Sequence, residues 1–276
     1  MSATFFRVEV HDGAEVFLGN DAARGPWDPG SCHAGPPTAL LARACEQAVA
    51  RADAERSRAG HSSRRLLVRL TVDLARPIPI DGFTITTTVD RAGRTTAATS
   101  AVLLDADGEV RVRAFGLHLR PSDDHPFPSA DLTTPDFAES QPGGFPIQRT
   151  GHGLQGFSSG VEMRYPPGHD RTPGPTSAWM RAIPVLSDEE PSGFQRICAL
   201  ADSGNAIGRN AEPDEVAFVN PDLTVTLHRE PDGEWFGTDV ISHWQPNGIG
   251  LADALLFDHL GPVGRAVQTI LLRKQG

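Results

Sequence analysis

One pentapeptide of the sequence fits a hydrolase motif. The segment GFSSG, Gly156–Gly160, matches the G-x-S-x-G pattern in which the central serine is a nucleophile. That motif needs a buried strand before the serine and a helix after it. Here a polar loop, QRTGHGLQ, precedes the segment and a predicted strand, VEMRY, follows it, so we expect no serine nucleophile. The chain also lacks HExxH, P-loop and dinucleotide-binding motifs, and no metal, ATP or NAD cofactor is expected.

His33 is a second candidate, because histidine can take and give a proton near neutral pH. It lies in CHAGPP, at the start of the longest predicted helix. No carboxylate accompanies it in a recognisable pattern, and CHAGPP also fits a plain loop–helix junction. Catalysis by His33 is therefore an alternative interpretation.

Three polar residues of the second half have side chains that suit holding water or a carbonyl group. Asp202, in ALADSG, can act as a base, and the amides of Asn220 and Gln268 can both donate and accept hydrogen bonds. Each also has an ordinary structural interpretation. Asp202 fits the C-terminus of a helix, Asn220 a turn before Pro221, and Gln268 a strand surface.

Composition and charge exclude several classes of partner. The 276-residue chain has a net charge of −10, a pI near 5.4 and scattered arginines, which argues against binding nucleic acid or an anionic membrane. Cys32, Cys45 and Cys198 have no CxxC spacing, so we expect reduced thiols. The start of the chain does not fit a signal peptide, and no apolar run approaches about 18 residues. We expect a cytoplasmic protein with no membrane partner.

The chain contains an internal repeat. LLVRLTVDLARP, Leu66–Pro77, returns as FVNPDLTVTLHR, Phe218–Arg229, with matching residues shifted by 153 positions. The same ungapped offset aligns 70–120 with 223–273 and places an Asp-x-x-Gly segment at an expected hairpin turn in each copy. A long fixed offset indicates two fused copies of one domain.

Each copy is predicted to contain two strands, a helix and four further strands. Alternating and β-branched residues predict strands over 4–10, 15–19, 66–75, 82–91, 95–107 and 109–120, and over 161–165, 176–183, 223–229, 234–244, 250–258 and 264–273. Helices are predicted over 33–58 and 187–204. The second helix could begin at a capping box, Ser187 to Glu190, or at Ser192.

A segment rich in Pro, Asp and Ser, Pro121–Pro146, predicts a linker that runs over the surface. We therefore place an N-terminal domain at 1–122, a linker at 123–150 and a C-terminal domain at 151–276. A curved antiparallel sheet around a helix is the hotdog architecture. The predicted fold class is α+β, a double hotdog with two tandem antiparallel sheets, each wrapped around a central helix.

Several segments, taken in this order, resemble a known family: CHAGPPTALLARA, LTVDLARPIP, VEMRY, LADSGNAIG, NPDLTVTLHR and GRAVQTILL. They resemble the acyl-CoA thioesterase II type of double-hotdog thioesterases, particularly a branch common in actinobacteria. The resemblance covers nearly the whole chain outside the linker. It implies an acyl-CoA thioesterase, with an acyl-CoA or an acyl carrier thioester as substrate and no cofactor.

The resemblance also implies a site in the second half, where a carboxylate, a hydroxyl residue and a glutamine hold the hydrolytic water. The matching residues are Asp202, Asn220 and Gln268, and the amide of Asn220 departs from the family's hydroxyl. The N–H groups around Gly204 could supply an oxyanion site. At the offset of 153, Gln268 corresponds to Phe115 and Asn220 to Leu67. The loss of both polar groups in the first half predicts one site per chain.

Two rival functions remain open at this point. One is a catalytically silent protein that binds acyl thioesters, and the other is a hotdog dehydratase or hydratase that uses His33. The chain could also assemble as a homo-oligomer of double-hotdog units.

Overall fold

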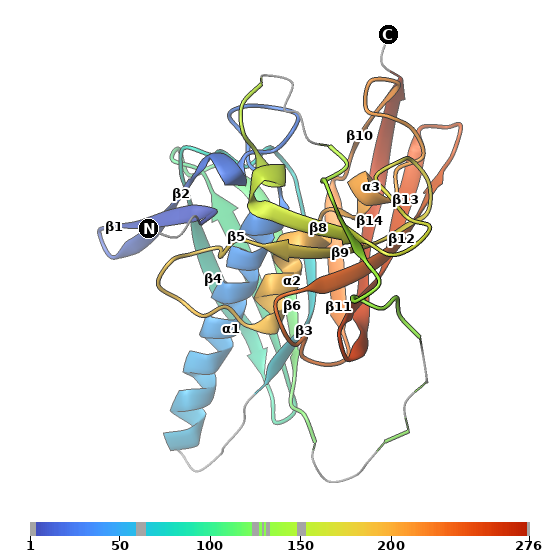
Figure 1. The fold of residues 1–276 in the computed structure, drawn as a ribbon. Helices are drawn as coiled ribbons and strands as arrows, with labels where there is room; N and C mark the ends of the chain where they lie inside the picture. The colour runs from blue at the N-terminus through green and yellow to red at the C-terminus, as the bar shows by residue number, and fades with distance from the viewer. Residues whose placement is uncertain are drawn as a thin grey trace.

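The computed structural model describes residues 4–58, 65–122, 127–128, 130, 133–147 and 153–274 (Figure 1). The first half contains β1 (Phe6–His11), β2 (Ala14–Gly19), the 3₁₀ turn η1 (Asp21–Ala23), α1 (Gly35–Arg58), β3 (Leu66–Asp73), β4 (Phe83–Ala92), β5 (Thr96–Leu104) and β6 (Val110–Leu119). The predicted order of two strands, a helix and four strands is confirmed.

The second half repeats this order with four additional short elements. It contains β7 (Gln141–Gly143), η2 (Phe157–Gly160), β8 (Val161–Tyr165), β9 (Thr176–Ala182), α2 (Gly193–Ala201), α3 (Gly204–Ile207), β10 (Val216–Val219), β11 (Asp222–Leu227), β12 (Phe236–Trp244), β13 (Ile249–Asp258) and β14 (Gly261–Lys274). The additional elements are β7, η2, α3 and β10.

The two predicted sheets join edge to edge into one 14-stranded antiparallel sheet in the described chain. Its strand order is β1-β2-β4-β5-β6-β3-β11-β14-β13-β12-β9-β8-β7, with β10 paired to β14. The junction is the pairing of β3 with β11, the two strands of the internal repeat. Thr71 lies opposite Thr224, and their Oγ1 atoms are 3.3 Å apart. Thr71 and Thr224 are equivalent positions of the two copies, since 224 is 71 plus 153. A pseudo-twofold axis therefore passes through this pair. The double-hotdog prediction is confirmed.

The offset of 153 fails on the last strand of each copy. Thr71 of β3 faces Phe115, whereas Thr224 of β11 faces Val267, so the offset between β6 and β14 is 152. The β13–β14 hairpin is one residue shorter: Leu256 pairs with Gly264 across seven residues (257–263), while Leu103 pairs with Val112 across eight (104–111). The predicted match of Gln268 with Phe115 is therefore wrong.

Gly116 is the structural counterpart of Gln268. A Cβ atom at Gly116 would overlap the Thr99 hydroxyl, so a longer side chain has no room there. Phe115 is half-exposed and points away from the core. Glycine also lacks the polar group of Gln268, so the argument for one site per chain keeps its basis, and one site per chain stays a prediction.

The two helices pack against each other on the inner face of the sheet (Figure 1). Gly35, at the start of α1, lies beside the Ala199 carbonyl near the end of α2, and a Cβ atom there would overlap that oxygen. Glu46, further along α1, accepts hydrogen bonds from Ser192 and Gln195 at the start of α2. The helices are therefore antiparallel, which brings the N-terminus of α1 to the C-terminus of α2.

Two start points are predicted for α2, a capping box at Ser187 and an N-cap at Ser192, and the structure has the second. Ser192 is the N-cap, and its side chain accepts a hydrogen bond of 3.1 Å from the Gln195 N–H. The capping box at Ser187 is wrong, because the helix begins at Gly193. The alternative that named Ser192 is confirmed.

Part of the predicted surface linker belongs to the folded core. The segment β7 pairs with β8, and Phe145 is buried against Phe157. The expectation that Pro121–Pro146 contributes no core element is wrong for this part. Phe145 is buried because the chain returns along the edge of the sheet before entering β8. In the part of the chain that the structure describes, no helix is long and apolar enough to cross a membrane.

Candidate active site

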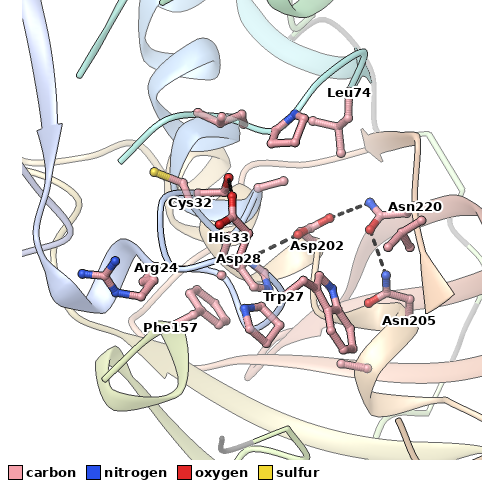
Figure 2. A pocket seen from close by; sticks show the side chains of 18 of the residues that line it. Arg24, Trp27, Asp28, Cys32, His33, Leu74, Phe157, Asp202, Asn205 and Asn220 are labelled. Atoms are coloured by element: carbon pink, nitrogen blue, oxygen red, sulfur yellow. Dashed lines mark hydrogen bonds and ion pairs between the residues drawn. The ribbon is translucent and has the colours of Figure 1, made fainter. Parts of the chain in front are cut away.

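A cavity of about 430 Å³ lies where the N-terminus of α1 meets the C-terminus of α2 (Figure 2). Apolar side chains from both halves of the chain line it, among them Trp27, Leu74, Ile78, Phe145, Phe157 and Phe218. The cavity wall also contains four polar side chains that belong to one connected group: His33, Asp202, Asn205 and Asn220. An apolar chamber with a few convergent polar groups is the usual form of a small-molecule site.

Asp202 is at the centre of the polar group. It is the C-cap residue of α2 and is only 5% exposed. Its Oδ1 atom accepts hydrogen bonds from Asn220 Nδ2 at 2.8 Å and Gln268 Nε2 at 3.0 Å. The Ala34 and Gly35 N–H groups, at the start of α1, also point to its carboxylate, and the Gly35 N–H is shared with His33 Nδ1 at 3.1 Å. The positive end of the helix dipole thus faces Asp202.

Burial raises the pKa of Asp202 to about 7, although the hydrogen bonds from Asn220, Gln268, Ala34 and Gly35 act in the opposite direction. Desolvation disfavours the charged form of a carboxyl group, whereas donors favour it. A carboxyl group with a pKa near neutrality can take a proton from water and release it again.

Gln268 lies behind Asp202 and is not part of the cavity wall. Its Nε2 atom donates to the Asp202 carboxylate and to the Asp202 backbone carbonyl at 3.1 Å. Its Oε1 atom accepts from the Asn205 N–H at 2.9 Å. The side chain is 1% exposed and therefore has one fixed orientation. In this geometry Gln268 contacts Asp202 rather than the space that a substrate would fill.

Gly204 makes room for Gln268. A Cβ atom at Gly204 would lie 3.0 Å from Gln268 Oε1, which is tighter than ordinary packing. Of the N–H groups considered for an oxyanion site, that of Asn205 is already bonded to Gln268. An oxyanion role for Gly204 stays a prediction.

Asn220 is fixed between Asp202 and Asn205. Its Nδ2 atom donates to Asp202 and to the Asp222 carbonyl at 3.1 Å, and its Oδ1 atom accepts from Asn205 Nδ2 at 2.8 Å. Sequence reasoning used Asn205 only for its backbone and missed its side chain. The available signal was its position in DSGNAIG, three residues after Asp202 and on the next helical turn.

His33 also joins this group. Its Nδ1 atom is 3.3 Å from Asp202 Oδ2, and its ring stacks on Phe157 with centroids 3.8 Å apart (Figure 2). Burial lowers the pKa of His33 to about 3, so the ring is neutral at pH 7. No carboxylate accompanies His33 in a sequence pattern, and its carboxylate partner in the fold, Asp202, comes from the other half of the chain.

The remaining sequence candidates do not form a second centre among the described residues. GFSSG forms η2 and its N-cap, and the strand that follows it, β8, is confirmed, so the segment does not form a strand–serine–helix elbow. Cys32, Cys45 and Cys198 are free thiols. Within the described ranges, no group of three His, Cys, Asp or Glu residues could hold a metal ion.

The sequence matches two family models along most of its length. Residues 23–119 match the acyl-CoA thioesterase N-terminal domain, and residues 129–272 match the acyl-CoA thioesterase C-terminal domain. The chain belongs to the acyl-CoA thioesterase family. It is therefore a thioester hydrolase. The cavity between its two halves is its candidate active site. No curated protein matches the sequence.

Solved structures show the same fold at low sequence identity. A candidate thioesterase from Novosphingobium aromaticivorans is 19% identical, with a TM-score of 0.69 and 98% of each chain covered. The acyl-CoA thioesterase II from Mycobacterium marinum is 14% identical, with a TM-score of 0.62 and 98% of this chain and 97% of that chain covered. A hotdog protein of unknown function from Alicyclobacillus acidocaldarius is 14% identical, with a TM-score of 0.67 and coverage of 98% and 97%.

Proposed function

We propose that this thioesterase hydrolyses acyl-CoA thioesters in the cavity between its halves, with Asp202 as the general base. The observation that carries the proposal is a buried carboxylate in the wall of an apolar chamber, held by two amides and the N-terminus of α1. The chamber can hold an acyl chain, and the carboxylate can act on water beside it.

The reaction needs few groups, because a thioester carbonyl is already electrophilic. Asp202 takes a proton from a water molecule, and the hydroxide oxygen attacks the carbonyl carbon. The tetrahedral intermediate then collapses to the free acid as the carbon–sulfur bond breaks. Asn220 lies in the cavity wall, where its amide can help hold the water, and Asn205 fixes the orientation of that amide. Gln268 acts through Asp202 and is a positioning residue.

The apolar lining supports an acyl group as the part of the substrate that enters the cavity. The walls include Phe145, Phe157 and Ile78, whereas Arg24 and Arg76 also border the cavity and can face an anionic carrier. Coenzyme A and a phosphopantetheine carrier both present phosphate groups. We propose coenzyme A as the carrier, in line with the family to which the chain belongs.

A thiol-release assay over a panel of acyl-CoA esters tests this function. We expect free CoA and free acid, with a kcat/KM that rises with pH up to about 7 and then levels off. The sign follows from Asp202, whose pKa is raised to about 7 by burial and which must be ionised to act as a base. Binding of acyl-CoA without thiol release would instead show a silent binding protein.

One observation favours a hydratase as the second candidate function. The pairing of His33 with Asp202 at 3.3 Å forms a histidine–carboxylate pair in the same cavity. Such a pair could add water to an enoyl-CoA without breaking the thioester. The same assay separates the two functions, because hydration consumes the enoyl absorbance and releases no thiol.

Substitution of Asn220, which stands where the family has a hydroxyl residue, tests whether its amide takes part in the reaction. We expect Asn220→Thr to keep or raise the rate, since a hydroxyl can donate to Asp202 Oδ1 and accept from Asn205 as the amide does. Asn220→Leu, which copies Leu67 of the first half, should lower the rate by roughly 10²-fold, because Asp202 loses a donor.

Steady-state thiol release measures both variants, and Asn247→Leu, in the exposed turn before β13, is the matched control. If the rate ignored both substitutions, Asn220 would be only the turn residue before Pro221.

A further inference from the structure

His33 is the one titratable side chain that contacts the Oδ2 atom of Asp202 among the described residues. Oδ1 already accepts from Asn220 and Gln268. We therefore expect a proton taken from water to bind Oδ2 of Asp202, the oxygen that faces His33. The ring of His33 is held there by its stacking on Phe157 and is 9% exposed.

The hydrogen bonds of His33 indicate where its own proton lies. Nδ1 accepts the Gly35 N–H at 3.1 Å. A ring nitrogen that accepts a hydrogen bond carries no proton, so the proton of neutral His33 is on Nε2. Nδ1 then faces Asp202 Oδ2 with a lone pair, which is favourable once Oδ2 is protonated. Among the described residues Nε2 has no hydrogen-bond partner, and His33 forms part of the cavity wall.

We propose, resting on the function proposed above, that His33 relays a proton from Asp202 to the departing thiolate. The Asp202 Oδ2 proton, taken from water, passes to Nδ1 of His33. The Nε2 proton passes at the same time to the sulfur of CoA as the carbon–sulfur bond breaks. The sulfur gains a proton, Asp202 returns to its ionised form, and His33 remains neutral in its other tautomer.

The pKa values of Asp202 and His33 fit this sequence of proton transfers. Burial raises the pKa of Asp202 to about 7 and lowers the pKa of His33 to about 3. His33 therefore does not take the proton and hold it, and transfer to Nδ1 requires that Nε2 gives up its proton in the same step. A thiol with a pKa near 8.5 is a moderate leaving group, and its protonation also prevents the thiolate from attacking the new acid.

Changing the leaving group distinguishes a proton relay by His33 from a role in which His33 only holds Asp202 in place. One acyl group is presented as its CoA ester and as its thiophenyl ester, whose aryl thiolate is more stable and leaves without a proton. His33→Asn keeps a polar atom near the Nδ1 position but has none at Nε2, and His33→Phe keeps the stacking on Phe157. Each variant is compared with the wild-type protein on the same ester. Gln268→Ala, which removes a donor to Asp202 and leaves the contact between His33 and Asp202 Oδ2 in place, is the comparator.

We expect both His33 variants to lower kcat on the CoA ester by about 10²-fold, and to lower it on the thiophenyl ester by roughly tenfold less. Gln268→Ala should lower both rates by the same factor. Equal losses on the two esters for His33→Asn would overturn the relay and leave His33 as a support for Asp202. Full activity of either variant on the CoA ester would also overturn it. Wild-type protein that releases no CoA would instead refute the proposed function itself.

Discussion

Asp202→Asn is expected to lower kcat for acyl-CoA hydrolysis by roughly 10²-fold or more. Asparagine keeps the size of the side chain but cannot take a proton from water. Gln268→Ala should have an effect of similar size, because Gln268 Nε2 fixes Asp202 Oδ1 at 3.0 Å and its loss frees the carboxylate to turn. Acyl-CoA binding should persist in the Asp202→Asn protein, since the apolar walls are unchanged.

Thiol release gives kcat for these variants, and circular dichroism shows whether each is folded. Asp253→Asn, on the outer face of β13, and Thr269→Ala, the exposed neighbour of Gln268, are matched controls that should retain the wild-type rate. A folded Asp202→Asn protein with wild-type turnover would refute the assignment of the general base.

The first half of the chain, residues 1–122, is expected not to fold alone as a native monomer. Without the second half, β3 becomes an open edge where residues 69–73 lose their pairing with β11. The buried face of α1 loses α2, and the Phe5 and Phe6 N–H groups lose the carbonyls of Pro184 and Val185. The fragment should aggregate or form a non-native dimer.

Light scattering after size-exclusion chromatography, together with thermal unfolding, measures this outcome. Co-expression of 1–122 with 123–276 is the control, and it should restore a soluble complex with one cooperative transition. A monomeric first half with cooperative unfolding would contradict the prediction and would show that the β3–β11 junction is not required.

The asymmetry of the two halves is the basis for predicting one site per chain. Leu67 and Gly116 stand in the first half where Asn220 and Gln268 stand in the second. A side chain at position 116 has no room, because the Thr99 hydroxyl already occupies the place of its Cβ atom. Both halves nevertheless build the cavity, since the first supplies the N-terminus of α1 and part of the apolar wall.

The sequence by itself determined the elements and their duplication. Alternating Val, Thr and Ile residues report which face of a strand is buried, and this signal is local, so the strands of both copies could be predicted. The fixed offset reported the repeat. Asp202 could be proposed as the base from its family resemblance, and the structure places it in the wall of the cavity.

Only the tertiary structure decided which groups surround Asp202. His33 is 169 positions away in the chain (202 − 33), and it reaches Asp202 because α1 and α2 pack antiparallel, end against end. The match of Gln268 to Gly116 depended on a hairpin one residue shorter in the second copy, which an ungapped comparison of sequences does not detect. Periodicity describes the faces of single elements, whereas a site at the junction of two domains depends on how those elements pack.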